Sequence, residues 1–212
     1  MKLVALLTLV CFTSATAQAA VFERDWKTPG DGLLTYDDVN QREWLDLSAS
    51  LLSQFSGTLE DRYQSAMAET MLGGEFESFT AARSIDVIAL AESAGIDTTT
   101  LDYPTNIAST QNMLALFGVT LTLGNVQYAV GLLDEISTNP SFPNRRVMSV
   151  FQLDFDDQLA GLSTLFVGSL DMVGGSNSTG IMLYRVVPEP SCMAIVFAAL
   201  FMVSRSRSVI HI

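Results

Sequence analysis

Three aspartates that lie close together are the residues whose type and spacing best suit binding of a cation. Asp154, Asp156 and Asp157 follow an apolar stretch that begins at Val147. On a strand, Asp154 and Asp156 would face the same side and offer the hard carboxylate oxygens that Ca²⁺ prefers. The segment lacks the glycine and the glutamate of an EF-hand loop, so it is not a site of that type. The competing interpretation is a solvated strand end.

Trp44 is the aromatic residue best placed to recognise a sugar, because Glu43 and Asp46 flank it. An aromatic face bordered by carboxylates can stack on a carbohydrate ring. The alternative is that Trp44 packs in the core with Leu45 and Leu47 of the same predicted strand. A glycosidase would need two carboxyl groups about 5 to 9 Å apart. The sequence does not single out such a pair.

The residues that common hydrolases use are missing from the central part of the chain. The two cysteines, Cys11 and Cys192, and the single histidine, His211, all lie near the ends. The central part therefore excludes Ser-His-Asp and Cys-His catalysis, the usual zinc sites and disulfides. It also has no glycine-rich phosphate loop. We expect a protein that is not an enzyme and has no cofactor, with Ca²⁺ as the one ion that its acidic groups could bind.

The chain is strongly acidic, with 23 Asp and Glu against 11 Lys and Arg and a net charge of −12 at pH 7. The segment 20–187 is more acidic still, at about −14, because three cations, Lys2, Arg205 and Arg207, but only one acid, Glu189, lie outside it. Such a surface repels nucleic-acid phosphates, and no basic stripe overcomes that repulsion. We expect no nucleic-acid partner. The alternative, and simpler, explanation of this acidity is that it keeps the protein soluble.

The central part of the chain, 20–186, predicts a single α+β domain. Thr58-Leu59-Glu60-Asp61 resembles a capping box that opens a helix reaching Leu72. Ser84 can cap a second helix that ends at Gly95, and 107–117 predicts a third. The predicted helices lie mostly in the first half of this part and the predicted strands mostly in the second half. This order favours an antiparallel sheet with about three helices. The predicted strands are 32–36, 42–47, 119–123, 126–133, 147–155, 163–170 and 181–187.

The C-terminal segment, 187–212, has the composition of a signal that targets a protein to the membrane. Val187-Pro188-Glu189-Pro190-Ser191 precedes an apolar run over 192–203, and Arg205 and Arg207 follow it. A helix of that length would be about 18 Å long against a hydrocarbon core of about 30 Å, so it would span a bilayer only marginally. The two arginines suit a cytoplasmic end, and the prolines separate the run from the domain. A single-pass anchor and a buried C-terminal helix are the alternatives.

The Pro-Glu-Pro motif at 187–191, the apolar run and the arginine pair together resemble the PEP-CTERM sorting signal of Gram-negative bacteria. The resemblance implies recognition by an exosortase, a membrane-embedded protease of the transpeptidase type, with cleavage near the motif. Proteins of this family are usually surface or matrix components in bacteria that make extracellular polysaccharide. Two departures are a shorter apolar run and the extra residues 208–212. The implied partners are the exosortase and the polysaccharide.

The N-terminal segment, 1–19, predicts a secretory signal peptide. Lys2 gives a positive start, 3–12 is apolar, and Ala17-Gln18-Ala19 is a small-x-small cleavage site. A short core helix is the alternative, but the segment is apolar all round and ends in small residues. The expected partners are the Sec translocon and signal peptidase. We expect export by the Sec route, transient tethering to the inner membrane by the C-terminal segment, and then residence at the cell surface or in the extracellular matrix.

The body of the chain carries a second resemblance. Residues 34–38 leading to 43–47, and 74–76 leading to 81–83, are similar to the opening of a recurrent domain in such exported proteins. That pattern in turn is similar to Lcl C-terminal-like domains, which have a C-type-lectin-like shape. Relatives tend to have a Trp-Arg pair where this chain has Ser78-Phe79. The resemblance implies a lectin-like domain.

The leading hypothesis is therefore a non-catalytic exported protein of the envelope or extracellular matrix, such as a biofilm component, sorted by an exosortase. The alternative is a carbohydrate-binding, lectin-like module assisted by Ca²⁺. Its candidate ligand contacts are Trp44, Asp154, Asp156 and Asp157. A glycosidase that uses carboxylates alone is a third option.

Overall fold

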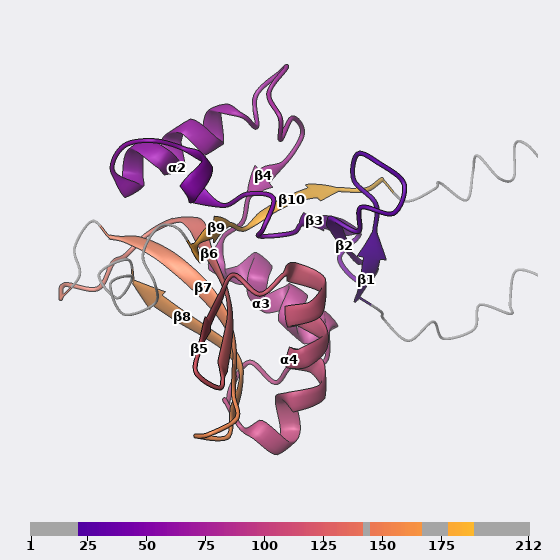
Figure 1. Ribbon diagram of the computed structural model, residues 1–212, viewed down its shortest axis with the longest axis vertical. Helices are drawn as coiled ribbons and strands as arrows, with labels where there is room; N and C mark the ends of the chain where they lie inside the picture. Colours follow the sequence, from indigo (N-terminus) through magenta and orange to yellow (C-terminus); the bar gives the residue numbers. More distant parts are fainter. Residues whose placement is uncertain (1–20, 142–144, 167–177, 189–212) are drawn as a thin grey trace, which may run out of the picture.

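The computed structural model describes residues 21–141, 145–166 and 178–188 (Figure 1). These residues form one α+β domain with α-helices and two mainly antiparallel sheets, so the predicted fold class is confirmed. The expected single sheet is replaced by two. The predicted signal peptide, 1–19, and the part of the sorting segment from 189 onward lie outside the described residues.

The first sheet has the strand order β1-β2-β3-β10-β4, and all its neighbours are antiparallel. Its C-terminal strand β10 is inserted between two strands from the first half of the chain. A turn joins β2 to β3, and in it Asp37 Oδ1 accepts hydrogen bonds from the backbone N–H groups of Val39 and Asn40, each at 3.1 Å. The strands are β1 (Val21–Arg24), β2 (Leu34–Asp37), β3 (Arg42–Leu45), β4 (Thr80–Ala81) and β10 (Leu183–Val186).

The second sheet has the order β5-β6-β7-β8, with the short strand β9 paired in parallel with β6. The chain then passes from β9 to β10 and links the two sheets. Met182 donates its backbone N–H to Leu132 O at 3.0 Å, and its carbonyl accepts from Ala82 N at 2.7 Å. The strands are β5 (Leu121–Leu123), β6 (Val126–Ile136), β7 (Arg146–Asp154), β8 (Leu159–Phe166) and β9 (Gly180–Ile181).

Helix α2 (Leu59–Ala68) begins as the sequence predicts, after the short 3₁₀ turn η1 (Leu52–Gln54). Thr58 Oγ1 accepts from Asp61 N at 3.2 Å, and the Asp61 carboxylate accepts from Thr58 N at 2.9 Å, which confirms the capping box. The helix ends at Ala68, short of the predicted Leu72.

The two other helices differ from the prediction at their first turns. Helix α3 (Ser84–Ser93) has Arg83 as its N-cap, because the Asp86 carboxylate accepts from Arg83 N at 2.9 Å, so Ser84 is the first helical residue and not the cap. Helix α4 (Tyr103–Phe117) begins four residues before the predicted start, since Asp102 caps it and Pro104 suits its first turn. Strand β8 likewise begins early, because the turn before it is short.

Two hydrophobic clusters cover opposite faces of the sheets. Helices α3 and α4 contribute Leu90 and Phe117 to the cluster that also contains Trp44 and Phe151. Helix α2 contributes Tyr63 to the other cluster, which lies against the opposite face. Strands between two apolar layers are buried on both sides, which explains why nearly all of β7 is buried without polar alternation.

Candidate functional site

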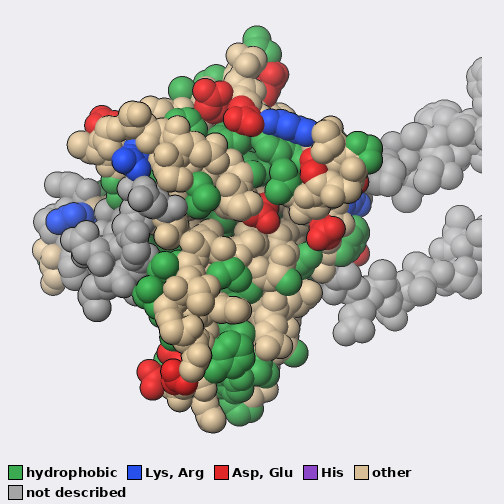
Figure 2. All heavy atoms as spheres, viewed as in Figure 1, with side chains coloured by type: hydrophobic (Ala, Val, Ile, Leu, Met, Phe, Trp, Pro, Cys, Tyr) green, Lys and Arg blue, Asp and Glu red, His purple; other side chains and the backbone are tan. Residues whose placement is uncertain are grey.

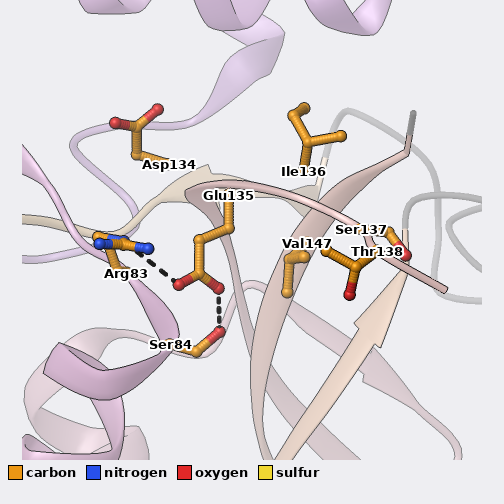
Figure 3. Close-up of a pocket in the computed structure, with 8 residues that line it drawn as sticks. All are labelled: Arg83, Ser84, Asp134, Glu135, Ile136, Ser137, Thr138 and Val147. Carbon is orange, nitrogen blue, oxygen red and sulfur yellow. Dashed lines mark hydrogen bonds and ion pairs between the residues drawn. The ribbon is translucent and has the colours of Figure 1, made fainter. Parts of the chain in front are cut away.

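An open pocket of about 630 Å³ lies where the N-terminus of α3 approaches the end of β6 (Figure 3). It combines two acidic residues, three hydroxyl groups, one arginine and two aliphatic side chains. Its lining residues are Arg83, Ser84, Asp134, Glu135, Ile136, Ser137, Thr138 and Val147.

An irregularity in β6 shapes this pocket. Leu132 pairs with Met148 and Ile136 pairs with Arg146, so β6 has more residues than β7 between these two pairs. A bulge of this kind bends the strand and redirects its side chains, and bulges occur often beside functional sites. Asp134 and Glu135, which are neighbours along β6, point in opposite directions in Figure 3, and Glu135 turns toward α3.

Glu135 is held by two groups from the start of α3. Ser84 Oγ donates a hydrogen bond to Glu135 Oε2, and Arg83 Nε lies 3.4 Å from Glu135 Oε1. The helix N-terminus adds a favourable field for a carboxylate at this position. The side chain of Arg83 is 67% exposed, so its remaining donors face solvent at the mouth of the pocket. Glu135 is therefore oriented and partly neutralised.

Asp134 belongs to a separate polar group on the α2 side of β6. The α2–β7 cluster consists of Glu60, Tyr63, Asp134 and Arg146. Arg146 binds Glu60 through two bonds, Nη2 to Oε1 at 2.8 Å and Nε to Oε2 at 3.2 Å, and its Cζ lies 3.5 Å from the centroid of the Tyr63 ring. Tyr63 Oη donates to Asp134 Oδ1 at 3.2 Å, and Arg146 Nη1 lies 3.7 Å from the same oxygen.

The electrostatics of the α2–β7 cluster favour a structural role. Hydrogen bonds from Arg146 hold the pKa of Glu60 below its ordinary value. Burial raises the pKa of Tyr63 well above its ordinary value, although Arg146 opposes the shift, and the nearby Asp134 adds to it. Tyr63 is thus a protonated donor at neutral pH. The cluster fixes α2 to the sheet.

The pocket offers hydrogen-bonding groups suited to a hydroxyl-rich ligand. The hydroxyls of Ser84, Ser137 and Thr138 can donate and accept, Glu135 accepts, and Arg83 donates. Ile136 and Val147 add an apolar surface of the kind that ligand pockets usually contain. Because Asp134 and Glu135 diverge, these two do not form the facing carboxylate pair of a glycosidase.

The three candidate aspartates adopt a turn and not a shared strand face. Asp154 is the last residue of β7, and its Oδ1 accepts from the backbone N–H of Asp156 at 2.9 Å and of Asp157 at 3.0 Å. The prediction that Asp154 and Asp156 face one side of a strand is therefore wrong, since the strand ends between them. Within the described ranges no group of three or more His, Cys, Asp or Glu side chains is arranged to hold a metal ion.

Trp44 is fully buried, with ring centroids 6.1 Å from Phe117 and 5.1 Å from Tyr184. Of its two predicted roles, packing in the core is confirmed and sugar stacking is wrong, because the side chain is completely buried. The carboxylates beside it also serve the fold. Glu43 is held between Arg24, at 3.0 Å, and Arg185, at 2.7 Å, while burial raises the pKa of Asp46.

The sequence prediction missed the pocket residues apart from Ser84, which it treated only as a helix cap. The available signal was the pair Asp134-Glu135 directly after 129–133, the buried apolar part of β6. A carboxylate pair at that point indicates a strand emerging at a polar edge. The partner of Glu135 could not be inferred, because Ser84 is 51 residues away along the chain.

The predicted sorting motif begins where the described domain ends. Val187 donates its backbone N–H to Gln41 O at 2.8 Å, and Pro188 is exposed. The predicted sorting residues Glu189, Pro190, Ser191, Arg205 and Arg207, and the cleavage residues Ala17 and Ala19, lie outside the described residues. Among the helices of the described part, none combines the length and apolarity needed to cross a bilayer.

Comparisons with known proteins give no relative for this fold and pocket. No protein-family model, no curated protein and no solved structure matches the chain. Functional inference therefore depends on the residues and on the geometry described above.

Proposed function

We propose that this chain is a non-catalytic exported protein of the cell envelope or extracellular matrix, sorted by an exosortase through residues 187–212. The observation that carries the proposal is the order of features after the last strand. Strand β10 ends at Val186, and the Pro-Glu-Pro motif, the apolar run and the arginine pair follow at once. A segment of that order directly after a folded domain is typical of a processing signal.

The strand registers support this proposal, because they place the attachment points of the N-terminal and C-terminal segments at the same end of the first sheet. Val21 pairs with Asp37, Asp37 with Arg42, and Arg42 with Val186. The first residue of β1 and the last residue of β10 therefore lie in one row across the sheet (Figure 1). Three strand spacings separate them, which is about 14 Å. This arrangement is compatible with attachment of both segments to one membrane during export.

The acidic surface of the domain is consistent with an extracellular protein that does not bind nucleic acid. On the face in Figure 2, Asp and Glu side chains lie at separate places over the domain. A chain of net charge −12 with dispersed carboxylates stays soluble and repels nucleic acid. The proposed partners are the Sec translocon, signal peptidase, the exosortase and extracellular polysaccharide.

The proposal is tested by localisation and intact mass in a bacterium that has an exosortase. A double variant, Pro188→Ala with Pro190→Ala, should keep the tail and accumulate at the inner membrane, whereas the unmodified chain should lose the tail and reach the surface or matrix. Pro29→Ala, in an exposed turn, is the matched control and should behave like the unmodified chain. Identical masses and fractions for all three proteins would refute sorting through this motif.

A second candidate function is carbohydrate binding, which the pocket around Glu135 supports. A carboxylate oriented by Ser84 and Arg83, with further hydroxyls nearby, matches the donors and acceptors of a neutral sugar. Binding at this pocket requires no Ca²⁺, in contrast to the Ca²⁺-assisted mode expected from the sequence.

A glycan array and titration with matrix polysaccharide, each with and without Ca²⁺, test this second function. Glu135→Gln should weaken binding at least about tenfold, equivalent to about 1.4 kcal/mol. Asp157→Asn, an exposed residue of the β7–β8 turn, should leave it unchanged. If the unmodified protein binds no glycan in either condition, this function is rejected.

A further inference from the structure

The connection between the folded domain and the apolar run is very short. Val187 is fixed to Gln41 by a backbone hydrogen bond of 2.8 Å, and the apolar run begins at Cys192. The chain can extend by at most about 3.3 to 3.6 Å per residue, so this connection spans no more than about 17 Å. The two prolines within it favour an extended form close to that limit.

We propose that the end of the first sheet that contains the β2–β3 turn lies against the membrane surface for as long as the tail is attached. The inference rests on the proposed function, which places the apolar run in the inner membrane. Polar headgroups extend about 5 to 7 Å beyond the hydrocarbon on each side. A connection of about 17 Å therefore leaves at most about 10 to 12 Å between the sheet end and the headgroups. The occupant of this surface is the lipid bilayer.

The residues at this end have the exposure that such contact requires. We define the membrane-facing end as Val21, Val39, Arg42 and Val186. Val39 is 52% exposed at the tip of the β2–β3 turn, and Val186 is 66% exposed at the end of β10. These two exposed valines lie next to the point where the C-terminal segment leaves the domain. They can enter the interfacial region of the bilayer without the desolvation cost that charged groups would have. Val21 and Arg42 occupy the same row of the sheet as Val186.

The charges near this end also permit a close approach. Arg42 Nη1 binds Asp86 Oδ1 at 2.8 Å, and Arg185 Nη2 binds Glu43 Oε2 at 2.7 Å. Asp37 is buried, and its Oδ2 accepts from Asn40 Nδ2 at 2.7 Å. Glu43 and Asp86 are thus neutralised by ion pairs and Asp37 is shielded by burial, while Asp38 in the β2–β3 turn is a carboxylate that no described ion pair offsets. Anionic headgroups therefore meet less repulsion at this end than the net charge of the chain suggests.

The geometry constrains the protease as well. The Pro-Glu-Pro motif starts one residue after the last hydrogen-bonded residue of the domain, so a membrane-embedded active site must work beside the sheet end. The short connection limits how far the domain can lie from the membrane, and a longer connection would raise that limit.

Depth-dependent fluorescence quenching tests the orientation. Full-length chain with Cys11→Ala, Cys192→Ala and one new cysteine is labelled with a fluorophore in inner-membrane vesicles from cells without exosortase, where the tail stays attached. The vesicles contain lipids with a nitroxide on the headgroup. Val39→Cys and Val186→Cys are the test positions, and Asp157→Cys, exposed in the β7–β8 turn of the second sheet, is the matched control. Quenching at 39 and 186 should exceed quenching at 157 at least about threefold.

A second chain with 12 Gly and Ser residues inserted between Val187 and Pro188 sharpens the test. Such a linker adds about 20 Å of average reach, so quenching at 39 and 186 should fall to the level at 157. Membrane-bound protein with equal quenching at all three positions overturns the orientation while the proposed sorting stands. Protein that does not sediment with the vesicles overturns both.

Discussion

Replacing the buried Arg146 with alanine should lower the stability of the domain more than replacing an exposed arginine such as Arg83. Arg146 is 8% exposed, binds Glu60 through two hydrogen bonds, donates to Leu133 O at 3.2 Å and lies over the Tyr63 ring. It joins α2 to β6 and β7. Its removal therefore breaks contacts in three elements at once.

The expected magnitude follows from the exposure of its partners. Removing one partner of a fully buried ion pair costs about 3 to 5 kcal/mol. The Glu60 side chain is 56% exposed, so water can solvate its carboxylate after the change, which favours the lower end of that range. We expect a loss of about 3 kcal/mol, or about 6 to 12 °C in Tm for a domain of this size.

Urea denaturation followed by tryptophan fluorescence measures the change, because Trp26 and Trp44 pack in the two different clusters. Arg83→Ala is the matched control: its side chain is 67% exposed, it forms an ion pair with Glu135 at 3.4 Å, and its loss should cost less than about 1 kcal/mol. Arg146→Lys should fall between the two, since lysine cannot form the forked pair with Glu60. Equal stability of Arg146→Ala and Arg83→Ala would refute this reasoning.

Three further changes test the packing, a helix cap and a buried acid. Gly131→Ala places a Cβ 2.7 Å from Met182 Cγ and should cost about 1 to 3 kcal/mol in urea denaturation; an unchanged urea midpoint would contradict the packing. Thr58→Ala should remove about 1 kcal/mol and lower helical circular dichroism, and an unchanged urea midpoint would argue against the capping box. Burial raises the pKa of Asp46 above 3.8, so its stabilising contribution is complete below 3.8 and is lost as pH rises through the higher folded value. Asp46→Asn removes this titration, so the urea midpoint of the variant relative to that of the unmodified protein should rise as pH increases through the folded pKa of Asp46. A difference that does not change with pH would count against that assignment.

Local signals explain what the sequence could predict of the fold. The capping box at Thr58 depends on residues three apart, so it is visible in the sequence and confirmed in the structure. The start of α3 was misjudged because a serine is a common cap, whereas here the carboxylate of Asp86 binds the backbone of Arg83. A carboxylate at the third helical position also indicates a helix start, and here Asp86 indicates the correct N-cap, whereas Ser84 does not.

Pairing across long sequence distances explains what could not be predicted. Nothing in the residues of β10 specifies that it lies between β3 and β4, because pairing depends on which edges remain free after the rest of the chain has packed. The division into two sheets depends on the same packing. At the pocket, Glu135 meets Ser84 only because β6 bulges and α3 begins beside it. The carboxylates beside Trp44 suggested a sugar site, yet Glu43 is held by Arg24 and Arg185.

The position of β10 has a consequence for the timing of folding. In a chain that crosses the membrane N-terminus first, residues 183–186 emerge after every other strand of the domain. Until then β3 and β4 lack the strand that lies between them, and the first sheet stays incomplete. Pairings of such high sequence separation form slowly. Under the proposed export route, the domain can close only once the translocation channel has released nearly all of it, so completion of the fold would coincide with arrival of the proposed sorting motif.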